Sequence, residues 1–262
     1  MPRVTVADVY RFLLSGRWLR LIAAALAAAA ACVAFGLWQL DRFDQRQDRN
    51  DLVRANLSAA LVDADTLMDV GRALRPAQQW RRVEARGRYD ESHEVLVRNR
   101  PLKGSTGYYV LTPLVTDTGP ALLVNRGWVP VGDTARTRPD VPGPPSGEVT
   151  VVGRARPSEP GDGGEDAPAG QVRRIDVPAI AASLPYDVYG GFAELVEQTP
   201  AAGSTPIPLP EPEPGSGPHL AYAFQWFVFA AIAVGGVAML ARREAREARQ
   251  DTPMTEPATV SG

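Results

Sequence analysis

Two long apolar runs constrain the fold of this chain more than any other feature of its sequence. They cover residues 21–40 and 220–241, and neither contains a charged residue. A helix of about twenty apolar residues is long enough to cross the hydrocarbon core of a bilayer. The sequence therefore predicts two transmembrane helices, with enough chain between them for one domain.

Arginines beside the two runs predict how the helices are oriented. They precede the first run and follow the second, at Arg3, Arg11, Arg17, Arg20, Arg242, Arg243, Arg246 and Arg249. Because basic residues collect on the cytoplasmic side, both termini are expected in the cytoplasm and residues 41–219 outside it. The expected location is the cell membrane, where the chain crosses twice and contacts membrane lipid. A cleaved signal peptide is the alternative for the first run, but its length and its bulky end at Phe35, Trp38 and Gln39 favour an uncleaved anchor.

The apolar runs divide the chain into six predicted parts. These are a cytoplasmic N-terminus (1–20), a first transmembrane helix (21–40), an extracytoplasmic stalk with a β-rich domain (41–199), a proline-rich linker (200–219), a second transmembrane helix (220–241) and a cytoplasmic tail (242–262). Residues 157–170 read as a mobile loop and those after 249 as a disordered tail. The linker is expected to run extended as a semi-rigid spacer.

Secondary-structure signals within the central part predict a mixed domain. Acids and bases alternate over 41–54, which indicates that the first helix continues as a polar stalk. Segments rich in valine, tyrosine and leucine predict strands over 82–89, 94–99, 108–115, 121–129, 148–156 and 192–198. A short helix is expected over 175–184, capped by Asp176. The predicted fold class is an integral membrane protein whose two helices flank an α+β domain dominated by antiparallel β-sheet.

Composition and missing motifs exclude several classes of function. Cys32 is the only cysteine, so the chain can form neither an internal disulfide nor a CxxC redox pair. Residues 41–219 contain 20 basic and 25 acidic residues, which gives no field for binding nucleic acid. His93 lies near no nucleophile-elbow serine, and the acidic residues form no metal-binding motif. We therefore expect no enzyme activity, no catalytic residue and no metal site.

One stretch of the predicted domain has a composition typical of binding sites. In VNRGWVP at 124–130, Arg126, Gly127 and Trp128 would form a bulge that presents a cation beside a large aromatic side chain. Arginine and tryptophan are enriched at binding hot spots. The alternative is an arginine that stacks on the tryptophan and closes the sheet.

The start of the second apolar run is the other candidate site. On a helical wheel His219, Tyr222, Gln225, Trp226 and Phe229 fall within an arc of about 120°. A glutamine amide facing lipid would be unsatisfied, so this face is expected to meet the first helix, a partner protein or a ligand. The imidazole is a suitable axial ligand for haem iron, and the alternative is an interfacial anchor of polar aromatic residues.

Five motifs in chain order resemble the surfeit-locus protein one family. They are GLWQLDR at 36–42, RGRYD at 86–90, GYYVLTPL at 107–114, VNRGWVP at 124–130 and the stretch beginning at His219. The resemblance implies an assembly factor for haem-copper cytochrome c oxidase that acts when haem a is inserted into the catalytic subunit. Its partners would be that subunit and haem-delivery proteins, and haem a would be bound transiently. A membrane-anchored envelope scaffold or hydrolase unrelated to respiration is the alternative.

The resemblance also suggests roles for individual residues. It implies that His219 is the haem a ligand, with Tyr222 and Trp226 beside it. It implies that Arg126, Gly127 and Trp128 shape a surface for the oxidase subunit or its haem-delivery partner. Three further residues, Trp38, Gln39 and Gln225, are expected at partner contacts, with the two glutamines hydrogen-bonding between the helices.

Overall fold

The computed structural model describes residues 11–132, 139–159, 161, 167–215 and 217–250. The chain forms two compact units, which we call the helix unit (residues 1–48 and 215–262) and the barrel unit (residues 49–214). Residues 160 and 162–166 of the predicted loop lie outside the described residues, as does the predicted tail from 251 onward.

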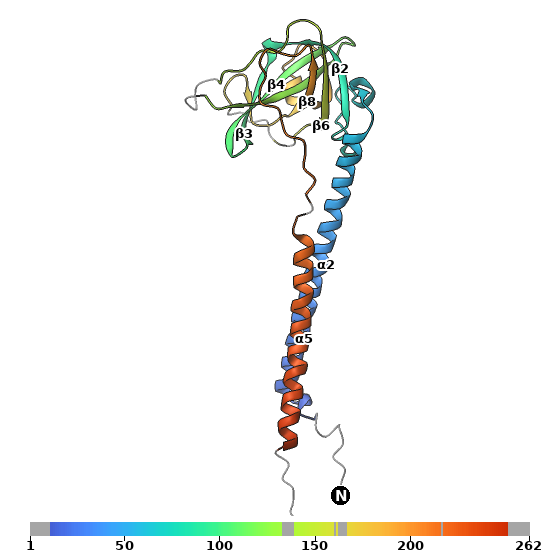
Figure 1. The fold of residues 1–262 in the computed structure, drawn as a ribbon, viewed down its shortest axis with the longest axis vertical. Coiled ribbons are helices and arrows are strands. Elements are labelled where there is room, and N and C mark those ends of the chain that lie inside the picture. Colours follow the sequence, from blue (N-terminus) through green and yellow to red (C-terminus); the bar gives the residue numbers. More distant parts are fainter. Residues whose placement is uncertain (1–10, 133–138, 160, 162–166, 216, 251–262) are drawn as a thin grey trace, which may run out of the picture. The chain divides into compact units, whose positions relative to one another are not determined.

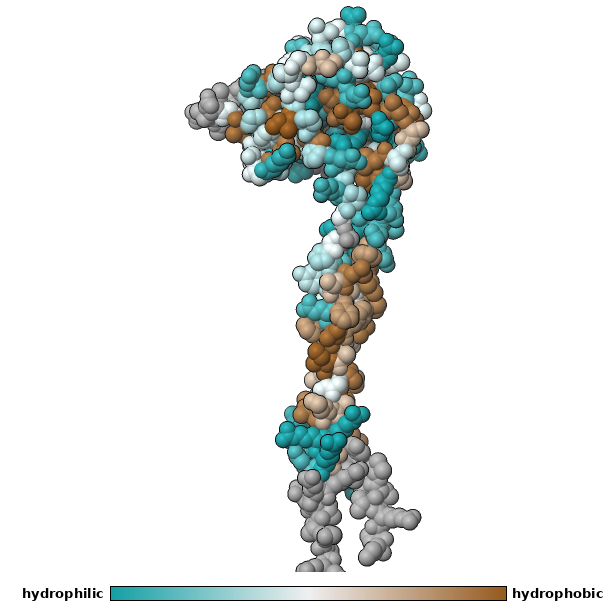
Figure 2. Space-filling model, viewed as in Figure 1, coloured by the Kyte–Doolittle hydropathy of each residue, from teal (hydrophilic) through white to brown (hydrophobic). Residues whose placement is uncertain are grey.

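Two long helices dominate the helix unit and lie side by side in Figure 1. Helix α2 spans Gly16–Ser58, after a short 3₁₀ turn η1 at Arg11–Leu14, and helix α5 spans His219–Gln250. Both are long and apolar enough to cross a membrane. Figure 2 shows an apolar band along the pair that gives way to hydrophilic residues toward the C-terminal end of α5. The polar residues 41–54 lie within α2, as their alternating charges predicted.

The two helices pack through a seam of regularly spaced small and apolar residues. On α2, the buried or half-buried residues include Trp18, Ile22, Ala25, Ala29, Cys32, Gly36 and Gln39. Their spacing alternates between four and three residues, the repeat of a left-handed coiled coil. Trp18 Nε1 donates to Glu244 Oε2 at 3.1 Å, and Gln39 bonds His219 at the opposite end. The pair is therefore antiparallel.

The barrel unit contains eight strands and several short helices. The strands are β1 (Val62–Asp63), β2 (Arg82–Tyr89), β3 (Val95–Leu102), β4 (Ser105–Thr116), β5 (Ala121–Pro130), β6 (Val149–Pro157), β7 (Gln171–Val172) and β8 (Val188–Thr199). The helical turns are α3 (Ala64–Leu67), η2 (Pro76–Gln78), η3 (Glu91–His93) and α4 (Val177–Ala181). Asp176 caps α4 as predicted, because its Oδ1 accepts from the Ala179 N–H.

The sheet closes on itself. The strand order is β1-β2-β6-β8-β5-β4-β3-β7, and a further pairing of β2 with β4 closes a barrel of β2, β6, β8, β5 and β4. Each predicted strand overlaps an observed one, and the two long apolar helices and the sheet-rich domain are confirmed. The closure was not predicted, nor was the parallel pairing of β5 with β8, which breaks an otherwise antiparallel barrel.

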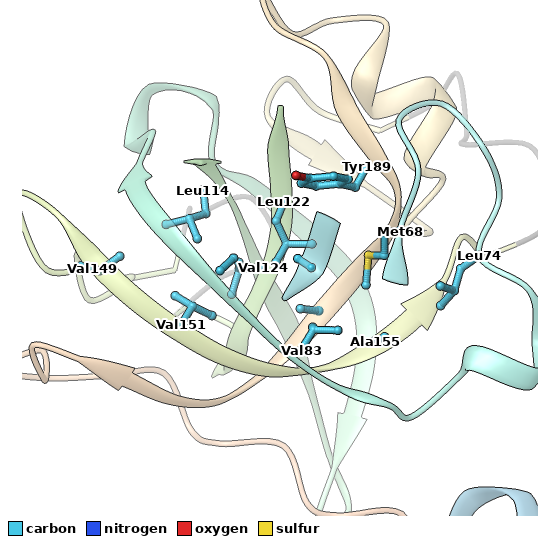
Figure 3. Close-up of a cluster of buried hydrophobic side chains, with 13 residues drawn as sticks. Met68, Leu74, Val83, Leu114, Leu122, Val124, Val149, Val151, Ala155 and Tyr189 are labelled. Atoms are coloured by element: carbon cyan, nitrogen blue, oxygen red, sulfur yellow. The ribbon is translucent and has the colours of Figure 1, made fainter. Parts of the chain in front are cut away.

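The barrel interior is the main hydrophobic core. Side chains that alternate along the five closing strands point inward, as Figure 3 shows. The cluster includes Val83, Leu114, Leu122, Val124, Val151 and Ala193, each at most 1% exposed. Full burial of a valine or leucine contributes about 1.5–3 kcal/mol, so this cluster accounts for much of the stability of the barrel. A second cluster, which includes Ile180 of α4 and Phe192 of β8, covers the outside of the sheet.

The proline-rich linker is attached to the barrel along part of its length. Ile207 and Trp128 exchange two backbone hydrogen bonds, each 2.8 Å long. Arg154 Nη2 donates to the Leu209 carbonyl at 3.2 Å. The linker predicted as a spacer over 200–219 is therefore held against β5 and β6 as far as Leu209.

Candidate functional site

A contact between His219 and Gln39 defines the first candidate site, at one end of the helix pair. His219 Nδ1 lies 2.9 Å from Gln39 Oε1. An amide oxygen only accepts hydrogen bonds, so Nδ1 must carry the proton, and in the neutral ring Nε2 keeps its lone pair. Histidines that bind metals have this arrangement, in which one ring nitrogen donates to an oxygen and the other coordinates the metal.

A glycine and an arginine lie beside the free ring nitrogen. Gly217 has a φ of +65°, and a Cβ atom there would lie 3.3 Å from His219 Nε2 and 3.4 Å from Arg46 Nη1. Arg46 is seven residues after Gln39, so it lies two turns further along the same face of α2. The lone pair of His219 Nε2 and the positive charge of Arg46 therefore both lie beside Gly217, which has no side chain. Sequence reasoning missed Arg46 and Gly217, although the seven-residue spacing from Gln39 was a usable signal.

Aromatic side chains next to this contact fall into two groups. Trp226 stacks on Phe35 of α2, with ring centroids 4.9 Å apart, and so belongs to the helix seam. Tyr222 and Trp38 are 48% and 50% exposed, on the outside of the pair. The Arg42 guanidinium lies 5.7 Å from the centroid of the Trp38 ring. Of the three residues expected near haem, the structure brings His219 and Trp226 to the seam and leaves Tyr222 outside it.

The predicted hydrogen bond between Gln39 and Gln225 is wrong. Gln39 bonds His219 instead, and Gln225 is exposed. The physical reason is the helical repeat, because the seam on α5 passes through His219, Ala223, Trp226 and Ala230 in steps of four and three residues. Gln225 projects from the opposite side of the helix.

Arg126 lies inside the barrel unit, where it forms a buried ion pair. Its Nη1 lies 3.1 Å from Glu94 Oε2, and the two side chains are 1% and 9% exposed. Its Nη2 donates to the Pro142 carbonyl at 2.7 Å. The Thr112 hydroxyl also donates to Glu94, at 3.0 Å, and the Arg126 guanidinium lies over the ring of Tyr89. Burial lowers the pKa of Arg126, and the Glu94 carboxylate opposes that effect. The expected exposed cation is thus a buried one.

Gly127 and Trp128 hold the linker. The β4–β5 register shifts next to Gly127, which gives the predicted bulge, and Gly127 has a φ of +135°. A Cβ atom at Gly127 would lie 2.6 Å from the Ile207 carbonyl oxygen. Trp128 is 4% exposed, and its Nε1 donates to the Arg100 carbonyl at 2.7 Å. These contacts fit the alternative interpretation, in which the motif closes the sheet. The arginine lies over the ring of Tyr89, however, and not over the tryptophan.

A second buried charge cluster was not foreseen. Glu194 Oε1 accepts from Arg156 Nη1 at 2.6 Å, and Glu194 Oε2 lies 3.7 Å from Arg154 Nε. The Arg156 guanidinium lies 3.8 Å from the centroid of the Trp80 ring. Burial raises the pKa of Glu194, and the two arginines oppose the shift. Arg154 and Arg156 alternate on β6, so a pair of charges on one face of a strand was the signal available in the sequence.

The groups around His93 do not form a catalytic triad. Asp90 Oδ2 lies 2.6 Å and Ser92 Oγ 3.1 Å from the same ring nitrogen, Nδ1, whereas a triad places the two partners on opposite nitrogens. Burial alone would raise the pKa of Asp90, but hydrogen bonds from Ser92, His93 and Tyr186 outweigh it and lower that pKa to about 2. Within the described ranges, no three His, Cys, Asp or Glu side chains are grouped to hold a metal ion.

Comparisons with known proteins agree with the motif order. Residues 26–231 match the family model described as the SURF1 family, a region that contains Gln39, Arg126 and His219. The chain is 33% identical to SURF1-like proteins of Mycobacterium bovis and Mycobacterium tuberculosis, over 99% of this chain and 96% of theirs. It is 29% identical to Surfeit locus protein 1 of Takifugu rubripes, over 76% of this chain and 87% of that protein.

Proposed function

This chain belongs to the SURF1 family, which is known for cytochrome oxidase assembly factors, and we propose that it assists haem a insertion into the catalytic subunit of a haem-copper cytochrome c oxidase. The observation that carries the haem step is the His219–Gln39 contact, which leaves one imidazole nitrogen with a lone pair at the end of the helix pair. The proposed location is the cell membrane, with both termini in the cytoplasm and the barrel outside it.

The residues at this end of the helix pair fit a haem in their chemistry. His219 Nε2 would coordinate the iron, and Gln39 would hold the imidazole in the tautomer that allows this. Arg46 would pair with a carboxylate, because haem carries two propionate groups. Haem a supplies the redox centre that the oxidase needs, and this chain would bind, orient and release it without a covalent step. Trp226 would keep the histidine side of α5 fixed against α2, and Tyr222 would contact the haem from the exposed side.

The barrel is proposed to meet the catalytic subunit or a haem-delivery protein. The contribution of Arg126, Gly127 and Trp128 would be indirect. These residues are buried, and their contacts fix β5 and hold the linker against it. Trp38 is exposed beside Arg42 at the outer end of the helix pair, and it would be available to a partner.

The test compares respiratory spectra of membranes from a strain that lacks this protein. The strain is complemented with the wild type, with His219→Ala or with His93→Ala, the other histidine in the sequence. We expect the deletion to lose a-type haem absorbance selectively and His219→Ala to reproduce that loss, while His93→Ala restores the signal. Full restoration by His219→Ala would reject haem ligation and leave a scaffold role. An unchanged a-type signal in the deletion strain would reject the assembly function.

A binding measurement separates the role of Gln39 from protein stability. The full-length protein in detergent is titrated with haem a, and the spectrum of the bound haem reports its axial ligand. Loss of a hydrogen-bond partner to a ligating histidine weakens binding about 10- to 100-fold, which is the loss expected for Gln39→Leu. Gln39→Glu retains an accepting oxygen and should bind close to the wild-type level. Equal affinity of Gln39→Leu and wild type would contradict the positioning role.

A further inference from the structure

Helix α5 has a second stripe, centred about 130° around the helix from its seam with α2. We call it the Gln225 stripe, and it consists of Gln225, Phe229, Ile232, Gly236 and Met239. The steps between these residues are four, three, four and three, so the stripe has the same repeat as the seam. Ile232 and Met239 are 62% and 70% exposed, Phe229 is 42% exposed beside Trp226, and Gly236 is half-buried.

The amide of Gln225 needs a partner that the described residues do not provide. It lies about 140–160° around the helix from Ala223 and Ala230, the buried seam residues. It also lies five residues inside the apolar run, about 8 Å below its start. At that depth water does not solvate an amide well, and an unsatisfied amide in hydrocarbon is costly. Lipid alone therefore does not explain this side chain.

Gly236 adds a second observation on the same stripe. A Cβ atom at this position would meet nothing within 4 Å. Glycine destabilises a helix relative to alanine, and no contact in the described chain requires its small size. Small residues at membrane helix interfaces allow two helices to approach closely. The stripe thus combines a hydrogen-bonding residue with a close-approach position about three turns further along the helix.

We propose that a second copy of this chain covers the Gln225 stripe, so that two α5 helices pack in parallel about a twofold axis. A glutamine amide both donates and accepts, so two copies of Gln225 at the same depth satisfy each other. The stripe contains no charge between Gln225 and Met239 that would select a different partner. Below it, Arg243 pairs with Glu247 of its own helix at 2.9 Å, which offsets part of the repulsion between the arginines of two copies. The proposal depends on α5 lying in the membrane and not on haem binding.

Single cysteines test this packing, because Cys32 is the only cysteine in the sequence. In a Cys32→Ala background, Ile232→Cys and Gly236→Cys lie on the stripe, and both keep Gln225. Ala223→Cys and Ala230→Cys face α2 and are the matched controls. After oxidation in native membranes, we expect disulfide-linked dimers of this chain from the stripe variants and little from the controls. Equal crosslinking of both sets, products with another protein, or no crosslinking would each overturn the proposal.

A second measurement tests the amide itself. Full-length protein labelled with donor and acceptor dyes is reconstituted into vesicles, and dimerisation is followed by energy transfer at increasing dilution in lipid. Hydrogen bonds between membrane helices are modest, so Gln225→Leu is expected to weaken dimerisation about three- to tenfold. Gln225→Asn keeps a self-complementary amide and should stay close to the wild type. Unchanged dimerisation in Gln225→Leu would contradict the proposal, and unchanged haem binding in the same variant would show that the two functions are separate.

Discussion

Replacement of Arg126 tests whether the signature stretch at 124–130 acts through the stability of the barrel. Arg126→Leu removes the ion pair with Glu94 and the hydrogen bond to the Pro142 carbonyl. The Glu94 carboxylate would then be buried without the guanidinium that balances its charge. Breaking a buried ion pair by removing one partner costs about 3–5 kcal/mol. That loss is a large part of the 5–15 kcal/mol that holds an ordinary domain folded.

The double variant distinguishes a buried charge from lost packing. Replacement of a buried pair by apolar residues is often neutral or stabilising, so Arg126→Leu with Glu94→Leu should recover most of the stability lost in the single variant. Arg88→Leu is the matched control, because Arg88 is exposed on β2 and its replacement should change stability by less than about 0.5 kcal/mol.

The assay measures unfolding of the barrel in the full-length protein. Samples in detergent are equilibrated in urea, and a short pulse of protease then cleaves the unfolded fraction. A shift of the midpoint to lower urea at constant slope reports lost stability. The reasoning fails if Arg126→Leu lowers the free energy of unfolding by less than about 1 kcal/mol. It also fails if the double variant loses as much stability as the two single variants lose together.

Two further changes test the linker attachment and an acid-sensitive contact. Gly127→Ala should cost about 1–3 kcal/mol and release the linker, because the residue has a φ of +135° and its Cβ atom would clash with the Ile207 carbonyl. Gly119→Ala has a positive φ but open space, so it should leave protease cleavage of the linker unchanged. Asp90 has a pKa of about 2, below its unfolded value, so its contribution is present above about pH 4 and lost as the pH falls toward 2. The stability gap between wild type and Asp90→Asn should therefore narrow over that range, and a gap independent of pH would contradict the assignment.

Local patterns in the sequence predicted the elements of the fold but not their closure. The strands follow from alternating apolar residues, and the long helices follow from runs without charge. Closure requires β2 to pair with both β6 and β4, and the parallel pairing of β5 with β8 joins strands that are far apart in the chain. Pairing between such distant segments leaves no local signal, because any apolar strand offers the same backbone groups.

The candidate site was only partly predictable for the same reason. His219 was found because a histidine at the start of an apolar run is unusual, and Gln39 because it ends one. Their contact depends on the register between two helices, which the seam residues on α2 and α5 decide together. Arg126 was expected at the surface because arginine is rarely buried. Its burial depends on Glu94, a residue 32 positions away in the sequence.

The two polar contacts of the helix pair also have a consequence for its position in the bilayer. Trp18 and Gln39 are separated by 21 residues of α2, or about 31 Å along the helix. That length is close to the thickness of a bilayer hydrocarbon core, so the two contacts would fall at its opposite boundaries. A thinner membrane would tilt the pair, whereas a thicker one would carry His219 toward the acyl chains. Lipid chain length would thereby control how accessible the imidazole is from the aqueous side, and haem titration in vesicles of different thickness would measure that dependence.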